Sequence, residues 1–137
     1  MRPDPRELAE SWLATAEQDL AVATEIAERY PSTACFHAQQ AGEKALKALL
    51  VAVAGDVVHT HRTDALLAEA RSLGIGLEGD VVGALEALEK YYLPTRYPDA
   101  LGMGSPTSAY KRADADLAIS HATLVLGAVR ARLRHED

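Results

Sequence analysis

Apolar residues recur every three or four positions along most of the chain. The first stripe begins just after Pro5, which suits the first turn of a helix, and Pro31 marks its end. Its spacing is that of one face of an α-helix, and acidic residues such as Asp19 fall off this face. The stripe consists of Leu8, Trp12, Ala16, Leu20, Ala23, Ala27 and Tyr30.

A second helix is predicted from Ser32, a good N-cap residue, to Gly55, which tolerates the backbone conformation that ends a helix. Its inner seam is rich in alanine, which lets two helix axes approach closely. Leu46, Leu50 and Val53 widen the seam. The seam residues are Ala34, Ala38, Ala41, Ala45, Leu49 and Ala52.

Three further helices follow. A short one is expected from Ala65 to Leu73, capped by Thr63 or Asp64 and terminated by Gly74. The next carries Val82, Leu85, Leu88 and Tyr92 at helical spacing and ends at Pro94. The last spans roughly residues 110–134, with Ala118, Ala122, Val125, Val129 and Leu133 facing inward and three arginines crowding its end.

These elements predict an all-α, up-and-down bundle of four to five helices in a single domain, residues 1–137. The core covers about residues 8–134, and the proline-rich segment 93–108 is an irregular loop. The hydrophobic fraction is 48% but aromatic residues make up only 5%, and small or straight-chain side chains favour helices over strands.

The formal charge of −6 argues against avid binding of nucleic acid by an isolated monomer, although a local basic groove stays open. Cys35, the single cysteine, has apolar neighbours and is expected to be a buried, unreactive thiol. The longest apolar run, Ala48 to Ala54, is too short for a membrane span. We therefore expect a cytoplasmic protein with no membrane association.

Three stretches together resemble the HEPN domain. Residues 35–50 read CFHAQQAGEKALKALL and resemble the family's QQA-x-EK helix. His61 stands three residues ahead of a short leucine-rich helix, as in the family's entry to its next helix. Residues 91–99 read YYLPTRYPD and are similar to its Y-x-x-x-R-Y-P-D segment. The order and spacing agree over about residues 12–133.

The resemblance implies a bundle like the substrate-binding subunits of nucleotidyltransferases. It also implies a homodimer that partners a minimal nucleotidyltransferase. Many HEPN proteins are metal-independent RNases whose Arg is followed after four to six residues by His, so that two chains build one composite site. Here Leu101, Gly102 and Met103 stand where Arg96 would require that His.

The RNase pattern is matched literally only by Arg130 and His135, in the terminal helix, and we interpret this match as chance. The favoured hypothesis is therefore a non-catalytic or catalytically degenerate binding and assembly module that takes a nucleotide or RNA phosphate in the dimer cleft. A toxin-like RNase of a toxin–antitoxin system, using Arg96 with an unconventional partner, is the alternative.

Arg96, Tyr97 and Asp99 are the candidate anion-binding corner; alternatively Arg96 braces its own loop through Asp99. Gln40, Lys44 and Lys47 lie on or near one helix face and are expected to form the opposite polar wall. In the alternative reading, Glu43 and Lys47 are an (i, i+4) pair on a solvated face.

His61 completes the set of candidate ligand-binding residues, although the preferred interpretation is that it satisfies a helix end or a buried carbonyl. His59 and His61 have no third ligand before Asp64, and no Glu is followed three residues later by His. No metal and no cofactor are expected. Tyr91 and Tyr92 are assigned to core packing and a dimer surface, with Trp12 and Phe36 as further interface anchors.

Overall fold

The computed structural model describes residues 3–56, 58–92 and 110–135 of the chain. These residues form helices and no strands, as the sequence predicts. The helices are α1 (Pro5–Ile26), α2 (Pro31–Ala54), α3 (Thr63–Ser72), α4 (Gly79–Glu89) and α6 (Arg112–His135).

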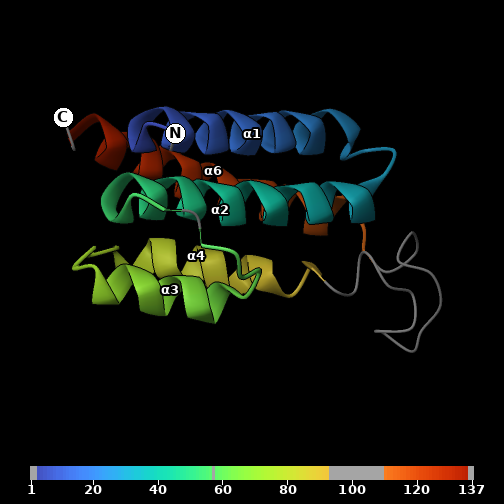
Figure 1. Ribbon diagram of the computed structural model, residues 1–137. Helices are drawn as coiled ribbons and strands as arrows, with labels where there is room; N and C mark the ends of the chain where they lie inside the picture. The colour runs from blue at the N-terminus through green and yellow to red at the C-terminus, as the bar shows by residue number, and fades with distance from the viewer. Residues whose placement is uncertain (1–2, 57, 93–109, 136–137) are drawn as a thin grey trace.

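The long helices run up and down (Figure 1). Helices α1 and α2 form an antiparallel hairpin with the most extensive contact in the bundle, and α6 packs against both. The shorter α3 and α4 cover the side of α2 and α6 that faces away from α1. The first turn of α1 and the last turns of α2 and α6 therefore lie at the same end of the bundle.

Alanine makes this close packing possible. Ala16 and Ala23 of α1, and Ala38 and Ala45 of α2, are fully buried. Gly42 is also at a point of close approach, because a Cβ atom there would lie 2.7 Å from Leu88 Cδ1 of α4. The alanine seam predicted from the sequence is therefore the inner surface of the bundle.

Helix ends follow local chemistry, with two corrections. The Asp4 side chain caps α1, and Gly55 ends α2 with φ of 84°, a conformation that favours glycine. Ser32 is not the N-cap of α2: it lies within the first turn, and its Oγ accepts from the backbone N–H of Tyr110 at 3.1 Å. Helix α1 ends at Ile26, before Pro31.

A few positions on the predicted apolar faces are wrong. Tyr30 is 55% exposed because α1 ends before it, and Val53, in the last turn of α2, is 36% exposed. Helix α3 starts at Thr63, whose hydroxyl donates to the Glu89 carboxylate, rather than at Ala65. Helix α4 buries Val81 and leaves Val82 only half-buried.

Two residues with acidic protons are buried as neutral groups: Cys35 in α2 and Tyr91 just after α4. Cys35 is fully buried, as predicted, and burial raises the pKa of its thiol to about 12. Tyr91 is also buried, in an edge-to-face contact with Tyr110, and burial raises the pKa of its phenol to about 12. No helix among the described residues is long and apolar enough to cross a bilayer.

Candidate functional site

One face of α2 is polar although it is buried. Gln39, Glu43 and Lys47 follow one another at intervals of four residues, and all three are almost inaccessible to solvent. Gln40 and Lys44 lie one position further round the helix and are partly exposed. Because residues four apart are neighbours on a helix surface, this spacing produces a continuous polar strip.

Glu43 is the centre of this strip. Its Oε2 lies 3.2 Å from Lys47 Nζ, and its Oε1 accepts from Gln39 Nε2 at 3.3 Å. Gln39 in turn accepts from Gln40 Nε2 at 2.7 Å. The Lys47 ammonium also lies 5.5 Å from the centre of the Trp12 ring, a cation–π contact from α1.

Asp19 of α1 adds a second carboxylate. It is 9% exposed, with Oδ1 at 2.9 Å from His37 Nδ1 and Oδ2 at 2.7 Å from Lys44 Nζ. An ionised carboxylate only accepts hydrogen bonds, so His37 carries its proton on Nδ1. One aspartate thus fixes the positions of a lysine and a histidine on the neighbouring helix.

His61 joins the strip from the connector between α2 and α3. Its Nδ1 lies 3.0 Å from Glu43 Oε2, while 60% of its side chain stays exposed. The ring stacks on Tyr92 with centroids 6.1 Å apart and planes inclined by 16°. The stack links the start of α3 to the residue that precedes the segment 93–109.

We call these residues the α2 polar cluster. Its carboxylates are buried, whereas the side chains of His37, Lys44 and His61 are exposed by 29%, 23% and 60% respectively. The exposed part of the cluster is therefore the Lys44 ammonium and two imidazole rings, each held by a buried carboxylate. Its members are Asp19, His37, Gln39, Gln40, Glu43, Lys44, Lys47 and His61.

A family model for the HEPN domain matches residues 9–132, nearly the whole chain. The chain belongs to the HEPN family. A crystal structure of the protein TT1696 from Thermus thermophilus is 38% identical, with a TM-score of 0.81 over 90% of this chain and 96% of that one.

A second solved structure is described as ST0689, an archaeal HEPN homologue. It is 33% identical to this chain, with a TM-score of 0.75, and the match covers 91% of this chain and 97% of the other. No curated protein matches the sequence significantly. The likeness extends over the whole helical bundle, so the HEPN fold predicted from the sequence is confirmed.

The candidate residues of this HEPN chain divide into two groups. Gln40, Lys44, Lys47 and His61 come together in the α2 polar cluster. Arg96, Tyr97 and Asp99 lie outside the described residues, so the anion-binding corner stays a prediction. Within the described parts of the chain, no group of three metal-ligating side chains is found.

The structure corrects the interpretation of the Glu43–Lys47 pair and that of His61. Glu43 and Lys47 form the expected (i, i+4) pair, but its side chains are only 2% and 4% exposed, so it is not on a solvated face. His61 is bound to a carboxylate, not to a helix end or a carbonyl. Trp12 of α1 contacts Lys47, and His61 of the connector contacts Glu43.

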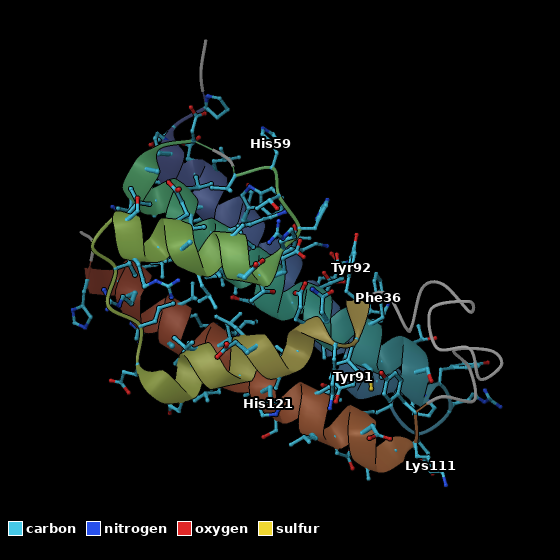
Figure 2. All side chains as sticks on the ribbon, turned by 90° about the horizontal axis from the view of Figure 1, so that it is seen from below. Phe36, His59, Tyr91, Tyr92, Lys111 and His121 are labelled. Carbon is cyan, nitrogen blue, oxygen red and sulfur yellow. The ribbon has the colours of Figure 1, made fainter. Side chains whose placement is uncertain are left out.

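Sequence reasoning missed the roles of Asp19 and His37. Asp19 was placed off the apolar stripe, yet Ala16, Asp19 and Ala23 are spaced by three and four residues and all lie on the buried face of α1. That spacing was the available signal. Among the other histidines, His59 is exposed and lies away from Tyr92 (Figure 2).

The Arg130 and His135 pair does not form a site in this structure. Arg130 Nε lies 3.2 Å from Glu17 Oε1 and lines a groove beside α1, whereas His135 lines a different hollow beside the start of α4. The two side chains therefore face different surfaces, which agrees with the interpretation of their spacing as chance.

Proposed function

We propose that this HEPN chain is a homodimeric binding and assembly module that partners a minimal nucleotidyltransferase. In this proposal it holds a phosphate of a nucleotide or RNA at the surface of the α2 polar cluster. One observation carries the proposal: Asp19 and Glu43 are buried, while the side chains that they hold, Lys44, His37 and His61, reach the surface.

This arrangement suits an anion for a physical reason. Lys44 and His37 are already held by Asp19, so less side-chain entropy is lost when a phosphate binds. Charge-assisted hydrogen bonds to phosphate are the stronger ones, and Lys44 supplies one. Arg96 follows Tyr92 by four residues, within about 14 Å of extended chain, so it is a candidate second cation.

The binding test is calorimetry with ATP and with a short single-stranded RNA. Lys44→Gln is expected to weaken binding about tenfold, because one charge-assisted hydrogen bond is lost. Lys111→Gln is the matched control, since Lys111 is an exposed lysine at the start of α6. Absence of binding at millimolar concentration, or equal weakening by both variants, contradicts the phosphate site.

Exposed leucines support a second copy of the chain as the partner of α6. Leu117 and Leu124 are 51% and 40% exposed, and their spacing of seven residues places them on one face of the helix. Light scattering of the wild type is expected to give a dimer at micromolar concentration. The double variant Leu117→Glu/Leu124→Glu tests this face, and Phe36→Glu tests the interface anchor predicted from the sequence.

The nucleotidyltransferase partner is tested by affinity capture from native cells with identification by mass spectrometry. Recovery of a minimal nucleotidyltransferase, with a matching gene beside this one, supports the assembly role. Its absence from the captured material, with no such neighbouring gene, contradicts that half of the proposal and leaves the phosphate site to be judged by calorimetry.

A second candidate function is metal-independent RNA cleavage, favoured by the two imidazole–carboxylate pairs. Asp19 faces His37 Nδ1 and Glu43 faces His61 Nδ1. A carboxylate at Nδ1 leaves Nε2 as the basic atom, the arrangement that orients a general base. Cleavage of total RNA in EDTA, abolished by His37→Gln or Arg96→Ala, would establish this function in place of the non-enzymatic one.

A further inference from the structure

A groove beside α1 is lined by residues from the first part of α1 and the last turns of α2 and α6. These ends of the three helices lie together at one end of the bundle (Figure 1). The groove has a volume of about 360 Å³, within the range of about 300–1,000 Å³ that holds small ligands. Its apolar floor is formed by Ala9, Leu13, Ala52 and Leu133. None of these residues belongs to the α2 polar cluster.

Charged side chains surround this floor, and their sum is positive. Arg6, Arg130 and Arg134 stand against Glu10 and Glu17. Arg6 lies 3.7 Å from Glu10, and Arg130 Nε lies 3.2 Å from Glu17 Oε1. The whole chain carries a formal charge of −6, so a locally positive groove is not a consequence of its composition.

Arg134 is a solvent-exposed cation at the edge of this groove. Within the described parts of the chain it has no hydrogen bond or ion pair, and its side chain is exposed. It follows Arg130 by four residues, so both guanidinium groups lie on the same face of α6. Arg132, between them, instead donates to the carbonyl of Gly76 in another part of the bundle.

We infer that this groove binds a small amphiphilic anion. Its phosphate or carboxylate pairs with Arg130 and Arg134, and its apolar part lies on Leu13 and Leu133. Guanidinium groups bind such anions through two parallel hydrogen bonds, and the apolar floor gives a favourable surface for the rest of the molecule. Glu17 competes with the ligand for Arg130, because its carboxylate already lies at hydrogen-bonding distance.

Calorimetry of the full chain with octyl phosphate, below its micelle concentration, tests the inference. Saturable binding that Lys44→Gln leaves unchanged is expected, since Lys44 does not line the groove. Arg134→Gln should weaken it about tenfold, the loss of one charge-assisted contact. Arg71→Gln should leave it unchanged, because Arg71 is also an exposed arginine in the last turn of a helix but does not line the groove.

Removing the competing carboxylate gives a result in the opposite direction. Glu17→Gln frees Arg130 and should strengthen binding several-fold, about what one exposed ion pair opposes. Glu7→Gln removes the same charge from an exposed position on α1 outside the groove and should have no effect. Inorganic phosphate, which has no apolar part, should bind at least about tenfold more weakly than octyl phosphate.

The inference is overturned if octyl phosphate does not bind at millimolar concentration, or if Arg71→Gln weakens binding as much as Arg134→Gln. It is also overturned if inorganic phosphate binds equally well. Two further arms separate the sources of such an anion. AMP binding that Arg134→Gln weakens identifies a soluble nucleotide, and co-sedimentation with phosphatidic acid vesicles that Arg134→Gln weakens identifies a lipid headgroup. Neither the variants nor the groove overlap the phosphate site at Lys44, so each proposal can fail alone.

Discussion

Two ion pairs in this HEPN chain have the same helical spacing and opposite surroundings. Glu43 and Lys47 of α2 are 3.2 Å apart and only 2% and 4% exposed. Arg112 and Asp116 of α6 are closer, at 2.8 Å, but 54% and 58% exposed. The distance between the charges therefore does not rank the pairs, because water screens the exposed one and is excluded from the other.

The difference shows why Glu43 has so many partners. A buried carboxylate that has lost water needs other groups to stabilise its charge. Glu43 has Lys47, Gln39 and His61, drawn from its own helix and from the connector. The exposed Asp116 has Arg112 and the solvent. The two pairs have the same spacing, so burial is what distinguishes the Glu43–Lys47 pair and explains the additional hydrogen bonds to Glu43.

The largest predicted effect comes from breaking the buried pair. Glu43→Ala leaves the Lys47 ammonium buried without its carboxylate, and we expect a loss of about 3–5 kcal/mol in the free energy of unfolding. Urea denaturation followed by circular dichroism measures it. The matched double variant Glu43→Leu/Lys47→Met should recover most of the loss, because neither charge is then buried alone. A loss below about 1 kcal/mol in Glu43→Ala contradicts the description of this pair.

A second prediction concerns buried acids that stay neutral, in contrast to Glu43. The pKa of Cys35 is raised from 9.0 to about 12 and that of Tyr91 from 10.0 to about 12, both mainly by burial. Above pH 9 the unfolded chain releases protons that the folded chain keeps. The stability that these groups contribute is complete below pH 9 and is lost as the pH rises toward 12.

The expected slope is about 1.4 kcal/mol per pH unit for each retained proton. Urea denaturation at several pH values between 9 and 11, a range that begins at the usual thiol value, measures it. Cys35→Ala and Tyr91→Phe should each make the decline shallower, whatever they do to stability at neutral pH. A slope that is the same in both variants and in the wild type would show that these two groups do not cause the decline.

A third prediction compares two helical glycines. A Cβ atom at Gly42 would meet Leu88 Cδ1 at 2.7 Å, whereas one at Gly83 of α4 would meet nothing within 4 Å. Alanine favours a helix over glycine by about 1 kcal/mol. We therefore expect Gly83→Ala to stabilise the protein by about that amount, and Gly42→Ala to destabilise it by about 1 kcal/mol because overpacking exceeds the gain. Thermal unfolding of both variants measures the difference, and equal stabilisation would show that Leu88 moves aside freely.

The fold was predictable because the inner helical faces consist mainly of alanine and leucine. The seams of α1, α2 and α6, and the end of α2 at Gly55, follow directly from spacing and from glycine's tolerance of positive φ. What the spacing could not predict is which polar residues are covered. Glu43 and Lys47 have the pattern of a solvated pair, but tertiary contacts, among them Trp12 of α1 on Lys47 and His61 on Glu43, accompany their burial.

The candidate site was predictable in part for the same reason. Gln40, Lys44 and Lys47 share a helix, so their common position on it follows from periodicity. Asp19 comes from another helix and His61 from a connector, and their contacts with α2 depend on tertiary packing. The grouping of Arg130 and Arg134 with Leu13 likewise appears only when the first and last helices are placed together.

The smallest effect is expected at the exposed pair of Arg112 and Asp116. Asp116→Ala removes the partner of Arg112, a contact that raises the pKa of Arg112 above its ordinary value. A guanidinium is charged at every accessible pH, so this shift gives no pH dependence of stability near neutrality, and water screens a pair that is more than half exposed, so its contribution is small. Water replaces the lost carboxylate at once, and the free energy of unfolding should stay within the error of a urea denaturation curve. If Asp116→Ala were as damaging as Glu43→Ala, burial would not be what separates the two pairs, and the network around Glu43 would need another physical cause.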